Sequence, residues 1–292
     1  MLVKFLDVGI AGLTMGGLYA LIALGLNLQW GVTRVLNIAH GEFLMLGAYS
    51  AFFLYSLFGI SPLLSLVICA PIFLGIGCLL HRTLFRHLLK TTKSMAGYEI
   101  ASLLAAYGLL FILSNAAALG FGPRPRAYSY LTQSVTFFGA TFALNRLVAL
   151  GISIGVSIVV YLFLTRTHLG KAIRATSQDM NTAQLMGINI HRVLTISFGL
   201  GTMLAAMGGS LLSMMFWVEP FMGFRYLIVA FIVVVVGGMG NILGSLAGGF
   251  ILGLVGSITT SFQAGLGMIA FYTVFIVILL VRPTGIFGKL ET

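Results

Sequence analysis

Residues 166–192, RTHLGKAIRATSQDMNTAQLMGINIHR, form a polar stretch in a chain that is otherwise strongly apolar. The runs on either side, 146–165 and 193–217, are each long enough to cross a bilayer as a helix, which takes about 20 residues. In the whole chain 59% of the residues are hydrophobic and 8% are charged, whereas soluble domains carry about 25% charged residues. The sequence therefore predicts an integral membrane protein whose residues 166–192 lie outside the bilayer.

Nine apolar segments predict an all-α, polytopic membrane protein with about 8–9 transmembrane helices, some of them broken or re-entrant. The segments fall at 8–30, 42–58, 61–80, 98–119, 146–165, 193–217, 227–239, 242–262 and 266–282. No linker tract separates them, so residues 1–292 are expected to form a single transmembrane domain. Pro71, inside the third segment, is expected to kink or locally break its helix.

Small residues recur at a spacing of four in three of these regions. Such stripes let the backbones of two helices approach closely in lipid, where no hydrophobic effect pulls helices together. We therefore expect the stripes to mark helix packing and not chemistry. They consist of Gly12, Gly16 and Ala20, of Gly201, Ala205 and Gly209, and of Gly240, Gly244 and Gly248.

Basic residues gather in the connections at 81–97 and 166–192 and in the C-terminal tail. The positive-inside rule places these segments on the cytoplasmic side and the segments 120–145 and 218–226 on the outer side. The net charge of +10 follows from this topology, so it does not predict a nucleic-acid partner.

Six polar residues lie within 16 positions of the first apolar region: Asn27, Gln29, Arg34, Asn37, His40 and Glu42. Irregular backbone at membrane depth is tolerated where it is buried in protein or lines a cavity, so we expect a broken or re-entrant element near 31–41. Glu42 should then lie in the first turn of the next helix, where the helix dipole favours an acid. Two compatible roles remain for Glu42: capping with a pairing to Arg34 or His40, or contact with a substrate. Three full crossings before residue 81 would put the N-terminus outside, and a re-entrant element would put it inside.

A glycine-rich break, GGMGN at 237–241, interrupts a later apolar run. Interrupted segments in the two halves of a transporter point to its pathway. The sequence contains no Gly-x-x-x-x-Gly-Lys-Ser/Thr loop for a nucleotide phosphate, no Ser-His-Asp arrangement and no metal-ligand spacing. We therefore expect the chain itself to be non-catalytic and to bind no cofactor and no metal.

From Leu169 to Gly187 the polar stretch is predicted to form an amphipathic helix bounded by Gly170 and Gly187. A helix that lies on the membrane surface can insert its exposed face into a groove of a partner protein. The alternative is a solvated loop whose charges only set the topology. The predicted apolar side of this helix consists of Ala172, Ile173, Ala183, Leu185 and Met186.

The run GKAIRATSQDMNTAQLMGINIHRV (170–193) resembles the cytoplasmic coupling segment of the permeases that import branched-chain amino acids in bacterial ATP-binding-cassette systems. The rest of the chain resembles the same family, and it is most similar to the smaller of the two permease subunits. The further matching motifs are NIAHGEF at 37–43, FGPRPR at 121–126, EPFMG at 219–223, VVGGMGNILGSLAGGFILG at 235–253 and RPTGIFG at 282–288.

The resemblance implies a permease subunit that forms the translocation pathway for branched-chain or other hydrophobic amino acids. It implies a second homologous permease, two ATPase subunits that hold ATP and Mg, and a periplasmic or lipoprotein solute-binding protein. It also implies multi-pass insertion among the lipids of the bacterial inner (cytoplasmic) membrane. Similar permeases carry urea, short amides or small carboxylates, and a stand-alone channel or ion-coupled carrier is the alternative from another class.

Two groups of residues are the candidates for these roles. For the translocation pathway they are Asn37, His40, Glu42, Gln29 and Asn241, where Gln29 is a departure from the apolar residue that we expect in the family. For coupling to the ATPases they are Gly170, Lys171, Arg174, Ala175, Asp179, Ala183 and Gly187. The segment 166–192 is called the coupling segment below.

Overall fold

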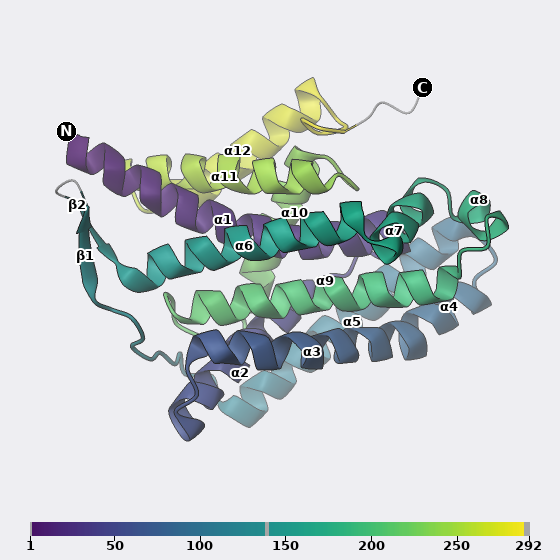
Figure 1. The fold of residues 1–292 in the computed structure, drawn as a ribbon, viewed down its shortest axis with the longest axis horizontal. Coiled ribbons are helices and arrows are strands. Elements are labelled where there is room, and N and C mark those ends of the chain that lie inside the picture. Colours follow the sequence, from purple (N-terminus) through teal and green to yellow (C-terminus); the bar gives the residue numbers. More distant parts are fainter. Residues whose placement is uncertain (1, 138–139, 289–292) are drawn as a thin grey trace.

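A computed structural model describes residues 2–137 and 140–288, and these are almost entirely helical (Figure 1). In chain order the helices are α1 (Leu2–Thr33), α2 (His40–Phe58), α3 (Pro62–Leu80), η1 (His81–Phe85), α4 (Arg86–Thr91), α5 (Met95–Phe121), α6 (Leu144–Arg166), α7 (His168–Gln178), α8 (Met180–Leu185), α9 (Ile190–Ser213), α10 (Met222–Gly237), α11 (Ile242–Phe262) and α12 (Leu266–Val281). One antiparallel hairpin joins α5 to α6 and consists of β1 (Ser134–Phe137) and β2 (Ala140–Ala143).

Each of the nine predicted apolar segments is a helix in the structure, which confirms the all-α polytopic fold. Among the described residues, seven helices are long and apolar enough to cross a membrane, while α10 and α12 are apolar but have only 16 residues each. The structure differs from the sequence prediction at two places in the third span. Helix α3 runs unbroken through Pro71, and the predicted loop at 81–97 is mostly helical because η1 and α4 continue α3 as far as Thr91.

The two ends of the bundle are distinct. The N-terminus and the β1–β2 hairpin lie at one end, and α7 and α8 lie at the opposite end (Figure 1). We call these the hairpin end and the coupling end. Within the described residues, three candidate spans, Phe5–Thr33, His40–Phe58 and Pro62–Thr91, precede α5, and α1 begins at the end opposite to the coupling segment. This arrangement agrees with the alternative of three crossings before residue 81.

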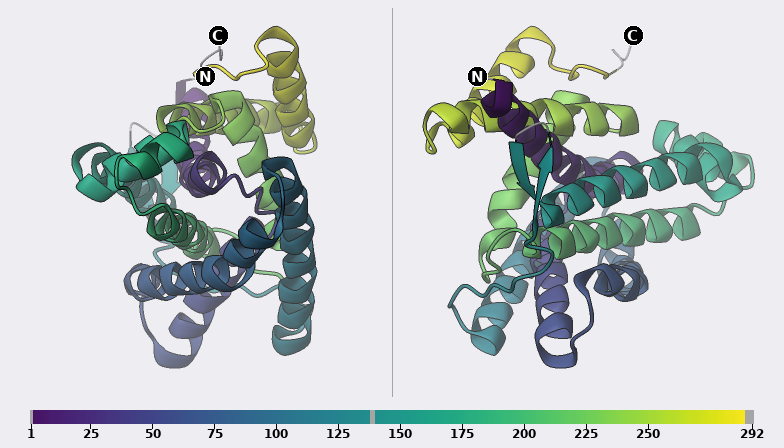
Figure 2. Two further views of the ribbon diagram at one scale, coloured as in Figure 1. Left: turned by 90° about the vertical axis from the view of Figure 1, so that its right-hand side faces the viewer. Right: turned by 60° about the vertical axis from the view of Figure 1, so that its left-hand side comes forward.

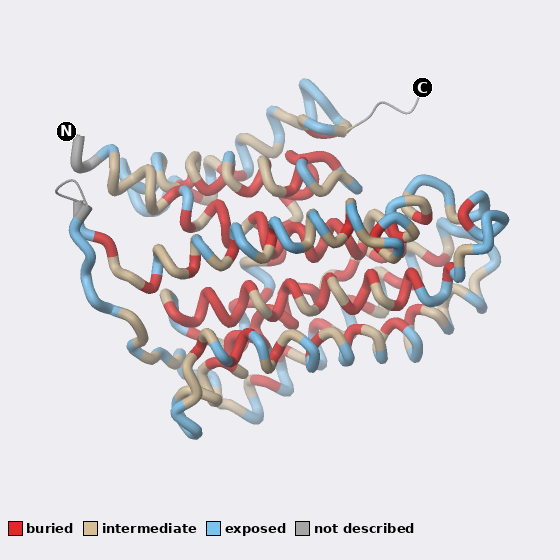
Figure 3. The backbone as a smooth tube through the Cα atoms, in the orientation of Figure 1, coloured by how far each residue is buried: buried red, intermediate tan, exposed pale blue. Residues whose placement is uncertain are grey.

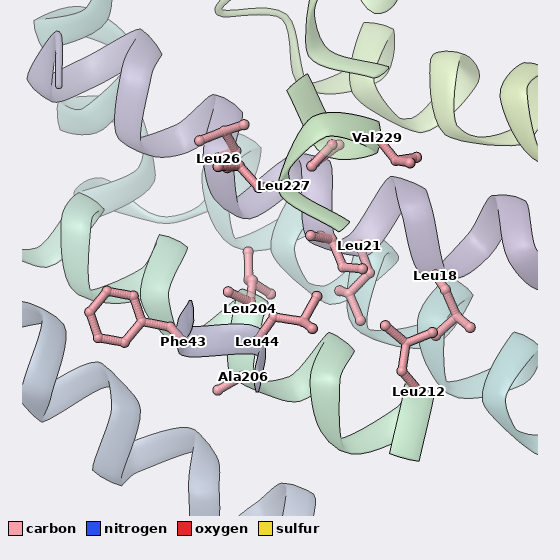
Figure 4. Close-up of a cluster of buried hydrophobic side chains, with 14 of the residues drawn as sticks. Leu18, Leu21, Leu26, Phe43, Leu44, Leu204, Ala206, Leu212, Leu227 and Val229 are labelled. Carbon is pink, nitrogen blue, oxygen red and sulfur yellow. The ribbon is translucent and has the colours of Figure 1, made fainter. Parts of the chain in front are cut away.

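The centre of the bundle is built on α1, which packs against α6, α9, α10 and α11. Buried residues are concentrated along α1 and α9, whereas α5 and α12 carry mostly exposed or half-buried residues (Figure 3). Leucines of α1 meet Phe43 and Leu44 of α2, Leu204 and Leu212 of α9 and Leu227 of α10 (Figure 4). The exposed apolar side chains of the outer helices are the surface that a membrane protein presents to lipid.

The small-residue stripes mark helix packing, as predicted, except at one position. On α1, a Cβ added to Gly16 would lie within 3.0 Å of the backbone of Phe250 on α11. On α9, a Cβ added to Gly209 would collide with the backbone of α2 at Leu44. Gly240 is the exception, because it lies in the turn between α10 and α11 with a φ of +80° and nothing within 4 Å of an added Cβ.

Replacing Gly209 with alanine is expected to lower the unfolding free energy by about 2–3 kcal/mol, because the backbone of α2 cannot yield to the new methyl group. The matched control is Gly75→Ala in α3, where an added Cβ meets nothing within 4 Å. That variant should be as stable as the wild type or slightly more stable, since alanine favours a helix over glycine. Thermal unfolding in detergent compares the two, and equal midpoints would contradict close α2–α9 packing.

Candidate functional site

A buried break between α1 and α2 carries the densest group of polar residues in the membrane region. Helix α1 ends at Thr33, and Arg34 adopts a left-handed conformation with a φ of +54°, which is uncommon for a residue other than glycine. Residues 35–39 are not helical, and Val35, Asn37 and Ala39 have no exposed surface. The predicted break near 31–41 is confirmed, and it is tolerated because it is enclosed by protein.

Gln29 is the centre of a hydrogen-bond network that joins α1, α2 and α9. Its Nε2 donates to the Phe198 carbonyl and to the Thr202 hydroxyl, both at 3.1 Å. Its Oε1 accepts from Asn37 Nδ2 at 3.1 Å and lies 3.2 Å from His40 Nδ1. The other ring nitrogen of His40 lies 3.1 Å from the carbonyl oxygen of Ile22.

The structure therefore brings together three of the five residues that the sequence proposed for the pathway. Gln29, Asn37 and His40 are all fully buried. A buried amide or imidazole must find partners, since an unsatisfied group of this kind costs about 1–3 kcal/mol. The network meets that need for Gln29 and His40 inside one chain, so it holds the α1–α2 break against α9.

Glu42 lies apart from this network. It is in the first turn of α2, as predicted, and is 1% exposed. The predicted pairing with Arg34 or His40 is wrong: among the described residues the ion pair found is Glu219 with Arg225. Positions 40 and 42 of a helix do not face the same side, and His40 points towards α1.

The carboxylate of Glu42 instead faces the beginning of α10. A Cβ added to Gly223 would lie 2.8 Å from Glu42 Oε1, and the backbones at Gly41 and Gly223 touch in the same region. Its other oxygen, Oε2, is buried without a hydrogen-bond partner in the described part of the chain. Glu42 thus places a buried acid at the contact between α2 and α10.

A cavity of about 240 Å³ opens between the α1–α2 break and α10. Asn37 belongs to its wall, but the side chain is fully buried, and Asn37 Oδ1 has no hydrogen-bond partner within residues 2–137 and 140–288. The wall from α10 could not be predicted from the sequence, because those residues have the composition of an ordinary span. The apolar lining residues are Leu26, Leu36, Ile38, Phe224, Leu227, Ile228 and Phe231.

Asn241, the fifth predicted pathway residue, belongs to a second group of hydrogen bonds, called the second polar junction. This junction holds the GGMGN break in place. Asn27 Nδ2 donates to the Asn241 carbonyl at 2.8 Å and to the Ser245 hydroxyl at 2.7 Å, and Gly240 N donates to Asn27 Oδ1 at 2.6 Å. Asn241 itself caps α11 by accepting from Gly244 N at 3.1 Å. Its Nδ2 donates to the carbonyl of Phe287 at 2.9 Å, so the junction also holds the RPTGIFG motif.

The coupling segment contains two helices where the sequence predicted one. Asp179 separates α7 from α8 and caps α8, since its carboxylate accepts from Asn181 N at 2.8 Å and from Thr182 N at 3.2 Å. A short polar side chain that bonds its neighbouring backbone competes with a continuous helix. The bond from the Thr182 hydroxyl, followed by these two amide bonds, lowers the pKa of Asp179 below its usual 3.8.

Removing this cap should loosen α8 alone. In Asp179→Ala, the amides of Asn181 and Thr182 lose their acceptor, so their hydrogen exchange should become faster while the amides of α7 remain protected. The lowered pKa means that the cap is fully formed at pH 7. It should be lost only as the pH falls through that lowered value, below 3.8. Unchanged exchange at Asn181 and Thr182 in the variant would contradict the cap.

The coupling segment divides its apolar residues between two surfaces. Ile173 and Ala183 are buried against the bundle, whereas Leu185 is 87% and Met186 79% exposed. Gly187 follows with a φ of +83°, which ends α8 as the sequence predicted. Gly170 does not end a helix: it lies in the first turn of α7, where an added Cβ would collide with the carbonyl of Phe163.

The remaining coupling candidates lie along α7. Lys171 and Arg174 are exposed, and Ala175 is half-buried. The segment therefore presents positive charge along α7 and an apolar pair at the tip of α8. The sequence named Leu185 and Met186 as part of one apolar side, but it could not separate them from the residues that pack on the bundle.

Comparison with known proteins gives a match along nearly the whole chain. The family described as "Branched-chain amino acid transport system / permease component" matches residues 9–281. The high-affinity branched-chain amino acid transport system permease protein BraD of Pseudomonas aeruginosa is 32% identical over 96% of this chain and 94% of its own. The permease protein LivH of Escherichia coli K12, of the same description, is 30% identical over 98% of this chain and 96% of its own.

A third relative has a similar identity. The probable branched-chain amino acid transport permease protein LivH of Methanocaldococcus jannaschii is 32% identical over 93% of this chain and 89% of its own. No solved structure matches the chain. The family match spans residues 9–281, and the relatives are of nearly equal length. The comparison therefore covers almost the whole chain. The chain is therefore a multi-pass membrane protein that belongs to the family of branched-chain amino acid transport system permease components.

Proposed function

We propose that this chain is the permease subunit of an ATP-binding-cassette importer for branched-chain or other hydrophobic amino acids. The observation that carries the proposal is the family match over residues 9–281, together with relatives of nearly equal length whose names specify this transport. The chain contributes one side of a pathway that it forms with a second, homologous permease. ATP hydrolysis belongs to two separate ATPase subunits, which hold the ATP and Mg.

The lining of the 240 Å³ cavity supports an aliphatic cargo. Its exposed walls are apolar, with the Asn37 side chain fully buried behind them, so it can bury a branched hydrocarbon side chain. Urea, short amides and small carboxylates would leave polar atoms against these apolar walls, and each unpaired polar atom costs free energy. The cavity therefore favours hydrophobic amino acids over those cargoes.

The pathway residues divide into two roles in this proposal. Leu36 and Ile38 of the α1–α2 break meet the cargo, while Gln29 and His40 hold the buried Asn37 and the break in place. Glu42 sets the contact between α2 and α10, the helix that forms the far wall of the cavity. Asn241 anchors the beginning of α11 and so fixes the other end of α10.

The coupling end supports the proposed ATPase partners. The exposed pair Leu185–Met186 at the tip of α8 is suited to insertion into a groove of a soluble partner. Lys171 and Arg174 add positive charge beside this tip. By the positive-inside rule this end faces the cytoplasm, and the hairpin end receives the amino acid from a periplasmic or lipoprotein solute-binding protein. The host membrane is then the bacterial inner membrane.

A pull-down of the tagged chain from detergent-solubilised membranes, followed by mass spectrometry, tests the assembly. We expect two ATPase subunits and a second permease to co-purify. Uptake of labelled leucine by cells that express the full set of subunits should require this chain. Recovery of the chain as a lone homo-oligomer would overturn the importer assignment and favour a channel or an ion-coupled carrier.

A further inference from the structure

A second cavity, of about 690 Å³, lies at the coupling end beneath α7. Its walls come from the last turns of α1, from α6 and α7, from the GGMGN turn with the beginning of α11, and from Phe287–Gly288. The left view in Figure 2 faces this end of the molecule, with α1 between α6 and α7 on one side and α11 on the other. The proposed transport function gives roles to Asn241 and Arg174 in its walls but assigns no occupant to the cavity itself.

Two arginines line the cavity without a compensating acid. Arg34 at the end of α1 and Arg174 on α7 both contribute to its walls, and no Asp or Glu lines it. Neither guanidinium makes an ion pair with any residue that the structure describes. Arg34 is held there by its left-handed backbone, whose amide donates to the Trp30 carbonyl at 3.0 Å. The cavity is therefore built to receive negative charge.

The rim of the cavity carries apolar side chains. Trp30 and Tyr161 line it, and aromatic side chains of this type gather where a membrane protein meets the headgroups. On α6, Ile158 lies three positions before Tyr161 and shares its face of the helix, and Ile158 is 52% exposed. On the opposite wall, Leu243 of α11 is 52% exposed. Acyl chains would therefore find apolar surface directly beside the arginine pair.

We propose that this cavity binds the headgroup of an anionic phospholipid. The phosphate lies between Arg34 and Arg174, and the acyl chains lie along the exposed apolar faces of α6 and α11. Basic pockets between helices on the cytoplasmic side of membranes are suited to such headgroups. A lipid held this way bridges α1, which carries the Gln29 network, and α7, which belongs to the coupling segment.

Two other occupants would satisfy part of this chemistry. A free phosphate or carboxylate from the cytosol would pair with the arginines but would make no use of the apolar rim. An acidic side chain of an ATPase would reach Arg174 only in the assembled importer. The test therefore uses the full-length chain purified alone, so that binding is measured without any partner protein.

Native mass spectrometry of the chain in detergent, with phosphatidylglycerol and phosphatidylcholine of identical acyl chains, measures the headgroup preference. Each arginine near an anionic headgroup contributes about 1 kcal/mol, or about 5-fold in affinity. The wild type should therefore prefer phosphatidylglycerol by about 25-fold, and the double variant Arg34→Gln/Arg174→Gln should lose this preference. The double variant Arg34→Lys/Arg174→Lys keeps both charges and should keep most of it.

The matched control is Arg82→Gln, which removes an exposed arginine on η1, outside the cavity lining. Its preference should equal that of the wild type. Equal binding of the two lipids by the wild type would overturn the proposal, as would an unchanged preference in the double glutamine variant or an equal loss in Arg82→Gln. Inorganic phosphate provides the last arm: if it displaces the bound phosphatidylglycerol at millimolar concentration, the site takes free anions and the lipid assignment is wrong.

Discussion

Replacing Leu185 and Met186 together with aspartate is expected to abolish ATP-driven leucine uptake while the chain remains folded in the membrane. The two side chains are 87% and 79% exposed, so aspartate disturbs no packing within the chain. In a docked complex they would be desolvated, and buried apolar anchors of interfaces are worth about 2 kcal/mol or more each. We therefore expect at least about a 100-fold loss of ATPase association, since every 1.4 kcal/mol is tenfold in affinity.

The neighbouring residue provides the control for this variant. Gln184 is exposed on the same turn and is already polar, so Gln184→Asp adds a charge to α8 without removing an apolar anchor. It should retain most of the uptake and of the ATPase association. Co-purification of the ATPases with each variant separates docking from transport. If the Leu185→Asp/Met186→Asp chain still recovers the ATPases at the wild-type level, the tip of α8 is not the docking surface.

The fold was predictable because its main determinant is hydropathy, which can be read from the sequence one segment at a time. Nine apolar runs gave nine helices, and the dense polar residues between Asn27 and Glu42 gave the break that the structure contains. The residue types also predicted correctly that Glu42 lies in the first turn of α2 and that a helix ends at Gly187, which has a positive φ. These features depend on residues that are close in the sequence.

The incorrect predictions concern features that depend on the direction of a side chain or on a local hydrogen bond that competes with a continuous helix. The α7–α8 helix was predicted as continuous because the apolar spacing continues past Asp179, whose carboxylate nevertheless caps a new helix. The pairing of Glu42 with His40 was predicted from proximity in the sequence, although the two side chains leave the helix on different sides. Neither cavity was predicted, since each is lined by segments that are more than 100 residues apart in the chain.

The hydrogen-bond partners could likewise not be predicted from the sequence, although the polar residues themselves could be identified. Gln29 was predicted to be a pathway residue and was noted as a departure from an expected apolar residue. The structure gives the reason for an amide at this position: it bonds the backbone of α9 at Phe198 and two side chains across the α1–α2 break. A residue that looks like a candidate for substrate contact can therefore serve by holding the pathway together.

Gln29→Leu is the variant that separates these two roles for Gln29. Leucine occupies a similar volume, but it leaves Asn37 Nδ2 and His40 Nδ1 without Gln29 Oε1 as their partner, whereas the Phe198 carbonyl still accepts from the Thr202 hydroxyl at 3.0 Å. Each buried polar group left unpaired costs about 1–3 kcal/mol, so we expect a loss of about 2–6 kcal/mol and a sharply lower unfolding midpoint in detergent. The matched control is Asn115→Leu on α5, since the Asn115 amide is exposed and bonds only within its own helix, to the Phe111 carbonyl at 2.8 Å. That substitution should change the stability by no more than about 0.5 kcal/mol.

A Gln29→Leu protein with the wild-type midpoint but reduced leucine uptake would show that Gln29 acts on the cargo directly. The network would then be a consequence of the fold and not a support for it.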